Sequence, residues 1–195
     1  MPVSTGFPRA RMLVVLLSAV LLPVASSWAV PPQWGYLGLS PPRETGGNLD
    51  AFGKAGMSLS QAIVAADQGH GTVLEIGFVK GNGETGYEAT VLVNGELRFR
   101  HVDPATGRVS DTSRRPVAKP SLNARARRDL ATMAKSPFDL AHAVATAEQV
   151  GGGHAISAGI EQLQGRPQYL VRTVTDGHVR SVIVDPLSGR AAPPA

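Results

Sequence analysis

The chain lacks cysteine and has few aromatic residues. Its 195 residues include no Cys, and Phe, Trp and Tyr together make up 5%. Without thiols the protein forms no disulfide, uses no thiolate nucleophile and binds no metal through sulfur. Without a recurring aromatic platform it also lacks the usual means of stacking nucleic-acid bases. We therefore expect stability to come from apolar packing, and we expect no nucleic-acid partner.

Long apolar runs are also scarce, and the clearest one lies at the N-terminus. Arg9 and Arg11 precede an apolar stretch at 12–24, which is short for a membrane span of about 20 residues. Small residues follow, so we predict a signal peptide at 1–29 with cleavage near Ala29. The mature protein is then expected to be periplasmic or secreted. The alternative is an uncleaved membrane anchor.

Two other segments have the composition of connectors. Residues 30–56 are rich in Pro and Gly, and we predict an extended, mobile leader there. Residues 112–135 are basic, and the Ala, Arg and Leu content of 122–134 favours partial helix. A basic segment can meet phosphate, an anionic membrane or an acidic partner, but charge runs usually stay in water. We expect a solvated linker, with membrane contact only through it or through an uncleaved signal segment.

The main positive feature is an internal repeat. Residues 69–108 recur, position for position, at 151–190, which lie 82 residues further on. The shared residues are mostly turn formers, which in the first copy are Gly69, Gly71, Gly77, Gly83, Tyr87, Gly95, Arg98, Val102, Asp103, Pro104, Gly107 and Arg108. A duplication that keeps its turns but not its His, Ser or Glu residues favours a paired recognition module over an enzyme.

In each copy we expect an amphipathic helix followed by three strands. Ser58 and Gln61 form a capping-box pattern ahead of the first helix, and Asp139 lies in the segment that caps the second. Segments of β-prone residues follow both helices, although neither face of the expected strands is cleanly polar. The expected strands are 73–79, 87–93 and 97–102 in the first copy and 155–160, 169–175 and 179–184 in the second.

Turn signals connect and close these strands. Asn94-Gly95 and Asp176-Gly177 predict two-residue hairpins, because both central positions of a type I′ turn need positive φ. Asp103 to Gly107 and Asp185 to Gly189 predict the closing turns. The predicted fold is therefore α+β, with two tandem modules at 57–111 and 136–192. Each module is expected to be one helix packed on a three-stranded antiparallel sheet.

This pattern resembles the PepSY domain, present here as two tandem copies. The best-matching stretches are Tyr87–Arg108 and Tyr169–Arg190, which both end in Val-Asp-Pro-x-Thr/Ser-Gly-Arg. The resemblance implies a non-catalytic module of the kind present in propeptides of secreted metallopeptidases, in exported bacterial proteins and in membrane-bound regulators and reductases. Such modules inhibit peptidases or tune a neighbouring protein. The family has no catalytic residues to transfer to this sequence.

Three stretches imitate chemical motifs, but none has the required context. Residues 81–86 satisfy G-x-G-x-x-G, yet a strand follows where phosphate binding needs a helix. Ser157 lies near a nucleophile-elbow pattern but early in a strand. His101 and Asp103 have the spacing of part of an iron site, but His101 is expected to face Glu88 across the hairpin. We predict no catalytic residue, no cofactor and no metal site.

Two repeated arginines are the binding candidates. Arg98 and Arg180 follow the hairpins at the same phase, and as a pair they could bind carboxylates or phosphates. The plainer alternative is a pair of solvent-facing strand residues. We predict an exported binding or regulatory module that acts on a peptidase or another envelope protein. The alternatives are a carrier of a small ligand or metal in the cleft between modules, and a structural envelope protein.

Overall fold

The computed structural model describes residues 46–81, 84–112 and 122–192. The strands are β1 (Thr72–Gly81), β2 (Glu84–Val93), β3 (Glu96–Val102), β4 (Val109–Asp111), β5 (His154–Leu163), β6 (Arg166–Thr175), β7 (His178–Val184) and β8 (Ala191–Ala192). The helices are α1 (Gly46–Phe52), α2 (Leu59–Asp67), α3 (Ala124–Met133) and α4 (Leu140–Gly151). None of these helices is long and apolar enough to cross a bilayer. The predicted signal peptide and residues 30–45 of the predicted leader lie outside the described residues.

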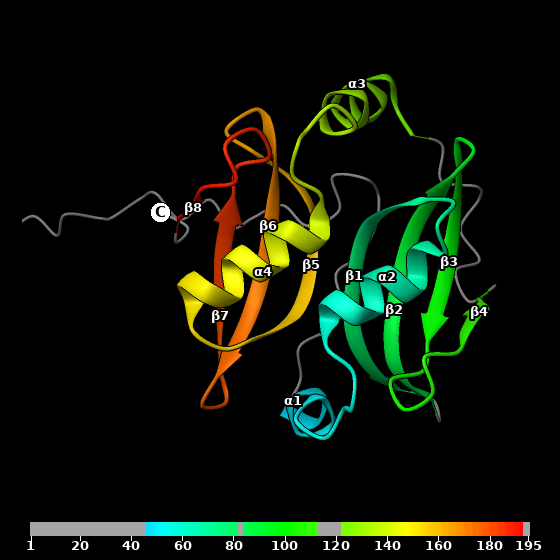
Figure 1. Cartoon of the computed structure of the whole chain (residues 1–195), viewed down its shortest axis with the longest axis vertical. Coiled ribbons are helices and arrows are strands. Elements are labelled where there is room, and N and C mark those ends of the chain that lie inside the picture. The colour runs from blue at the N-terminus through cyan, green and yellow to red at the C-terminus, as the bar shows by residue number, and fades with distance from the viewer. Residues whose placement is uncertain (1–45, 82–83, 113–121, 193–195) are drawn as a thin grey trace, which may run out of the picture.

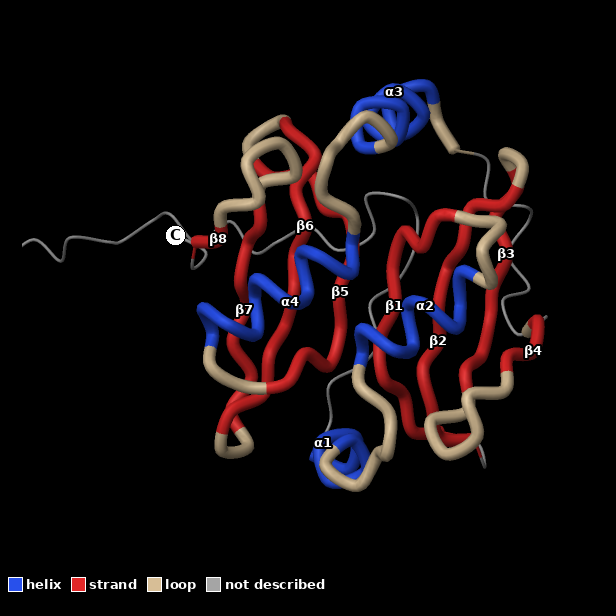
Figure 2. Tube along the Cα trace, in the orientation of Figure 1, coloured by secondary structure: helices blue, strands red, loops and turns tan. Residues whose placement is uncertain are grey.

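All eight strands form one antiparallel sheet, in the order β4-β3-β2-β1-β5-β6-β7-β8. Figure 1 shows α2 and α4 side by side across one face of this sheet, and Figure 2 shows the strands behind them. The predicted fold class, two modules with separate three-stranded sheets, is therefore wrong. The halves share a single sheet because β1 pairs with β5 through Ile76 and Ala158. A separate three-stranded meander would leave outward-facing backbone N–H and C=O groups of β1 unpaired at an edge, and the pairing of residues 75–77 with 157–159 satisfies those at its centre.

Each half also contains a short fourth strand that the sequence did not indicate. The turn that begins at Asp103 does not end the first half but reverses the chain, so that Val102 pairs with Val109 in β4. Its equivalent in the second half pairs Val184 with Ala191 in β8. The closing turns are therefore hairpins, and β4 and β8 are the two edges of the sheet.

The duplication is exact in the strands. The bounds of β1, β2 and β3 recur 82 residues later in β5, β6 and β7. Even the register shift between Val73 and Glu75 recurs between Ala155 and Ser157. A β-bulge of this kind bends and twists a strand, so both halves share the same curvature as well as the same pairing.

The predicted turns are confirmed. Asn94 and Gly95 have φ of 51° and 81°, and Asp176 and Gly177 have φ of 51° and 75°, as a type I′ hairpin requires. In the closing turns, Asp103 accepts the N–H groups of Ala105 and Thr106, and these bonds hold the pKa of Asp103 below its usual range. The equivalent Asp185 accepts backbone N–H groups from Ser188 and Leu187, which also lower its pKa. Gly107 and Gly189 complete these turns with φ of 69° and 66°.

The helices α2 and α4 bury their apolar stripes on the same face of the sheet. The capping box at Ser58 and Gln61 is confirmed in both directions, and Asp139 accepts the backbone N–H of His142 at 2.8 Å. The two core tyrosines tie the sheet to the segments that lead into the helices, since Tyr87 donates to the Met57 carbonyl and Tyr169 to the Phe138 carbonyl. The largest fully buried side chains include Tyr87, Phe78, Leu59, Leu74, Ile76, Ile156 and Leu170.

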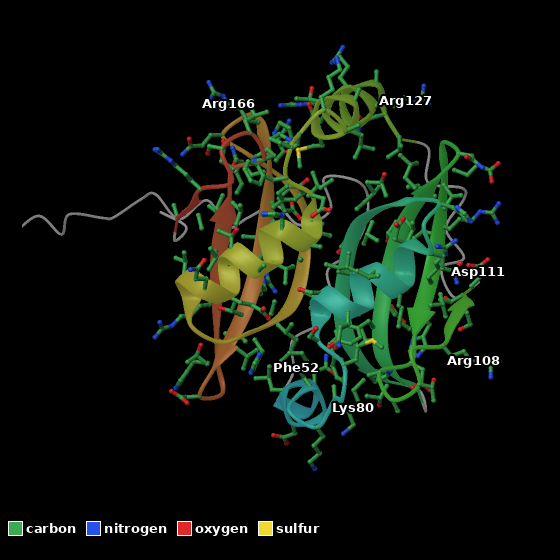
Figure 3. All side chains as sticks on the ribbon, in the orientation of Figure 1. Phe52, Lys80, Arg108, Asp111, Arg127 and Arg166 are labelled. Atoms are coloured by element: carbon green, nitrogen blue, oxygen red, sulfur yellow. The ribbon has the colours of Figure 1, made fainter. Side chains whose placement is uncertain are left out.

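Two further helices lie in the segments that were predicted to be connectors. Helix α1 occupies residues 46–52 of the predicted extended leader, and α3 forms within the predicted linker, where partial helix was expected. Helix α1 forms despite its two initial glycines because it is anchored by tertiary contacts. Asn48 Oδ1 accepts the backbone N–H of Lys80, and the Phe52 ring stacks edge-on against Phe78 with centroids 5.5 Å apart. Figure 3 shows Phe52 and Lys80 beside α1, at the opposite end of the molecule from α3 and Arg127.

A candidate polar site at the seam between the two halves

The β1–β5 pairing, which we call the seam, has the geometry of a two-fold axis. Ile76 and Ala158 are equivalent positions of the repeat, and they pair directly with each other. On either side of them, Glu75 pairs with Gly159 and Gly77 pairs with Ser157. This is the pattern of an isologous dimer interface, in which the same surface contacts itself. The two halves therefore meet as two copies of one subunit would meet.

Polar side chains are buried on the side of the seam that faces away from the helices. Successive strand residues point to opposite faces, and Ile76 belongs to the apolar core. Glu75, Ser157 and Glu161 therefore lie on the other face, where they are only 9%, 2% and 4% exposed. Arg172 pairs with Ser157 and is half-buried beside them. We call Glu75, Ser157, Glu161 and Arg172 the seam cluster.

Gly159 leaves space on β5 for the side chain of Glu75. A Cβ at Gly159 would lie 3.3 Å from Cγ of Glu75, so the Glu75 side chain lies directly against the backbone of β5. Glu161 is two residues from Gly159 along β5, which makes it a diagonal neighbour of Glu75 across the seam. Such diagonal pairs lie roughly 7–8 Å apart and are within reach of long side chains.

The electrostatics of the cluster show that these groups interact. Burial and the neighbouring Glu75 carboxylate raise the pKa of Glu161 to about 8, while the Arg172 guanidinium acts in the opposite direction. Oε2 of Glu161 and Oγ of Ser157 are buried without a hydrogen-bond partner in the described part of the chain. An unsatisfied buried polar group typically costs about 1–3 kcal/mol. The seam therefore holds polar groups at a cost to folding.

The cluster breaks the symmetry of the repeat. Glu75 corresponds to Ser157 in the other half, Thr90 to Arg172, and Val79 to Glu161. The sequence interpretation set such positions aside because they do not recur, and it missed Glu75, Glu161 and Arg172. A usable signal was present, since Glu75 lies between Leu74 and Ile76 and Glu161 directly follows the small and apolar residues 158–160. A composite site at a two-fold axis is built once, from both halves together. One copy of each functional residue is therefore enough, and equivalent positions can carry unlike residues.

The predicted arginine pair is not brought together. Arg98 lies on β3 and Arg180 on β7, with four strands between them, which corresponds to about 24 Å at the usual strand spacing. Both side chains are exposed, and Arg98 makes an ion pair of 3.0 Å with Glu96. A small carboxylate or phosphate cannot bridge the two guanidinium groups, so each remains a separate candidate.

The structure also shows the surroundings of the three motif-like stretches. Ser157 is buried and forms no hydrogen bond to a histidine within the described residues. His101 pairs with Glu88 across the hairpin, as predicted. The described residues contain no group of three or more potential ligands arranged for a metal ion. The glycine-rich loop connects two strands, and its central residues 82–83 are not described.

Comparison with known proteins gives little further information. No protein-family model and no curated protein matches the chain. A solved structure that it resembles is that of a putative lipoprotein from Clostridium difficile 630, at 14% identity and a TM-score of 0.36. The match covers 67% of this chain and 85% of the lipoprotein. This similarity is too weak to support an argument about function.

Proposed function

We propose that the protein is an exported, non-catalytic binding module that regulates a peptidase or another protein of the cell envelope. The two PepSY-like sequence units would then act as one recognition domain. The observation that carries the proposal is the seam cluster, a single composite polar site made from unlike residues of a duplicated scaffold. The signal-peptide pattern at 1–29 supports export.

The cluster favours recognition over catalysis. Catalysis by a serine needs a base within hydrogen-bond reach and a site where a substrate carbonyl can lie next to both. Ser157 has neither a base nor any other hydrogen-bond partner among the described residues. A partner that supplies a donor or an acceptor to Ser157 or Glu161 would instead recover the free energy that their unsatisfied atoms cost in the free protein.

In this proposal the partner approaches the face of the sheet opposite α2 and α4. Glu75, Ser157 and Glu161 are buried, so the proposal requires that the partner gain access to them on binding. Glu88 lies on this same face, next to Gly77 in the register, and its side chain is exposed. It therefore offers a position from which a bound partner can be captured without altering the cluster itself.

Site-specific photo-crosslinking tests this arrangement. A benzoylphenylalanine placed at Glu88 in the full chain should capture a discrete envelope protein after irradiation of intact cells. The matched control places the same group at Ala145, which is exposed on α4. The captured protein is then purified, and its affinity is measured for wild type and for Glu75→Gln and Arg172→Met.

The expected result is capture from Glu88 but not from Ala145, with affinity reduced at least tenfold by either seam substitution. If neither substitution changes the affinity for the captured protein, that protein does not bind at the seam cluster, and this result would contradict the proposal. Turnover of ester or peptide substrates by the purified protein, lost in Ser157→Ala, would show instead that the protein is an enzyme.

A further inference from the structure

A cavity lies between the two halves on the helix side of the sheet. Its volume is about 370 Å³, and it opens between α2, α3 and the start of α4, above β1, β5 and β6. Ligand pockets usually have volumes of about 300–1,000 Å³, so this one is large enough for a small molecule. It is on the opposite face from the seam cluster, and nothing in the proposed function uses it.

The walls of the cavity are mostly apolar. The side chains that form them include Ile63, Val64, Leu130, Met133, Leu140 and Ile160. Val64 is 69% exposed, and it is one of three exposed large apolar side chains among the described residues. An apolar body placed in the cavity would cover Val64 and remove this apolar surface from water, which is the usual driving force for such binding.

The symmetry of the molecule shows that this space is not an obligatory feature of the fold. Ile160 in the cavity is the equivalent of Phe78 in the other half. At Phe78 the space is filled, because the Phe52 ring of α1 stacks on Phe78, which in turn stacks on Tyr87 with centroids 5.2 Å apart. The described residues form no such aromatic stack at Ile160, which lines the cavity beside α3 instead.

The polar groups that line the cavity determine which charge on a bound molecule is favoured. The Tyr169 hydroxyl donates to the Phe138 carbonyl, and the Ser136 hydroxyl bonds to the Phe138 and Pro186 carbonyls. Both hydroxyls are therefore already engaged. Among the described lining residues, the remaining polar side chains are Thr72 and two carboxylates, Asp67 and Asp139.

Each of these carboxylates has an oxygen available. Asp67 and Asp139 use Oδ1 to accept the backbone N–H groups of Gly71 and His142, at 2.9 and 2.8 Å. Within the described residues Oδ2 of neither accepts a hydrogen bond. No Lys, Arg or His is among the described residues that line the cavity. The nearby Arg100 is engaged at the end of α2, where it donates to the Ala66 and Asp67 carbonyls.

We propose that this cavity binds a small molecule with an apolar body and one cationic amine. The apolar body occupies the space between Ile63, Met133 and Ile160, and the ammonium group interacts with Asp67 and Asp139. An anionic molecule of the same shape is disfavoured, because the described lining presents two carboxylates and no cationic side chain to it.

Titration with matched eight-carbon probes tests the proposal. Octylamine and octanoate have the same chain and opposite charge, and both are titrated into the full mature chain below their micelle concentrations. Methyl NMR of Ile, Leu, Val and Met reports where they bind. We expect octylamine to shift the methyl signals of Ile63, Met133 and Ile160 saturably, and we expect at least tenfold weaker binding of octanoate.

Substitutions then test separately the contribution of the cavity's shape and that of its carboxylates. Ile160→Phe introduces the residue of the other half, and it should reduce octylamine affinity at least tenfold by filling the cavity. Asp67→Asn and Asp139→Asn keep the backbone-accepting oxygen, and together they should abolish the preference for the amine. The matched control Asp176→Asn removes a carboxylate from a distant hairpin and should leave the affinity unchanged.

Three results would overturn the proposal. These are equal affinities for the two probes, saturable shifts at methyl groups away from the cavity, or no shift with either probe. The wild-type NMR measurement does not depend on the folding of any variant, so an unfolded Ile160→Phe would not remove the test. The photo-crosslinking result at Glu88 concerns the other face of the sheet and is independent of this outcome.

Discussion

The two halves of the molecule share their strands but attach their helices to the sheet differently. In the first half, Arg100 is buried beneath the end of α2, where its guanidinium donates to the Ala66 and Asp67 carbonyls and lies 3.5 Å from Asp111. In the second half, Val182 replaces Arg100, and a Cβ at Gly151 would lie 3.2 Å from Cγ2 of Val182. A buried arginine therefore donates hydrogen bonds to the last carbonyls of α2, whereas the end of α4 packs closely on the sheet through a glycine.

This comparison indicates which parts of the duplicated scaffold are constrained. Pairing, bulge and turns are retained in both halves, because each is needed to form the shared sheet. Helix ends, the seam face and the space under α1 and α3 differ between the halves. The regions that differ are those in which a function can reside without loss of the fold.

The largest expected effect comes from removing the charge of Glu161, whose equivalent in the other half is the uncharged Val79. The pKa of Glu161 rises from 4.5 to about 8 on folding, so the folded state retains a proton that the unfolded state releases. Stability should therefore fall as pH rises from about 4.5 to about 8, by at most about 1.4 kcal/mol per pH unit. Glu161→Gln should remove this dependence and stabilise the protein by a few kcal/mol at pH 9, with little change at pH 4.5.

Urea denaturation of both proteins at the two pH values measures this effect. The exposed Glu88 on the same face provides the control, because Glu88→Gln should change stability little at either pH. An equal gain from Glu161→Gln at both pH values would show that the pKa of Glu161 is the same in the folded and unfolded states.

The next effect concerns Arg100. Arg100→Val introduces the residue of the other half and leaves the last carbonyls of α2 without their donor. We expect a loss of about 2–3 kcal/mol, since hydrogen bonds to charged groups contribute about 1.5–3 kcal/mol. Asp111→Asn removes only the ion pair, whose carboxylate side chain is 68% exposed, and should cost less than about 1 kcal/mol. Equal losses for the two variants in urea denaturation would assign the stabilisation to the ion pair instead.

Local structure within each half could be read from the sequence. The capping box at Ser58, the hairpin at Asn94-Gly95 and the Asp103 turn depend on neighbouring residues, and each is present as predicted. The helix at 46–52 could not be read in this way, because it depends on the contact between Phe52 and Phe78 rather than on its own propensity.

The joining of the halves could not be predicted for a related reason. Two short apolar strands carry no signal that specifies whether they are edges or neighbours. Whether β1 and β5 become neighbours depends on the pairing of Ile76 with Ala158, which are 82 residues apart in the sequence. The candidate site was missed for the same reason, since Glu75 and Glu161 become neighbours only after this pairing forms.

The smallest effects, at the hairpin glycines, test whether the two halves unfold together. Gly95 and Gly177 both have strongly positive φ, and a Cβ at either would meet nothing within 4 Å. Gly95→Ala and Gly177→Ala therefore incur only the backbone cost of that conformation, which is about 1–2 kcal/mol for a residue other than glycine. Because the turns are equivalent, the two losses should be equal, and because the turns are far apart, they should add in the double variant.

Calorimetry distinguishes one cooperative unit from two. If the seam joins the halves into a single unit, each variant should show one transition, displaced by the same amount whichever half carries the substitution. Two transitions, of which only one moves with each variant, would show that the β1–β5 pairing does not couple the halves. The seam would then be a contact between independent modules, and the cost of its buried glutamates would fall on that contact instead of on the stability of the whole sheet.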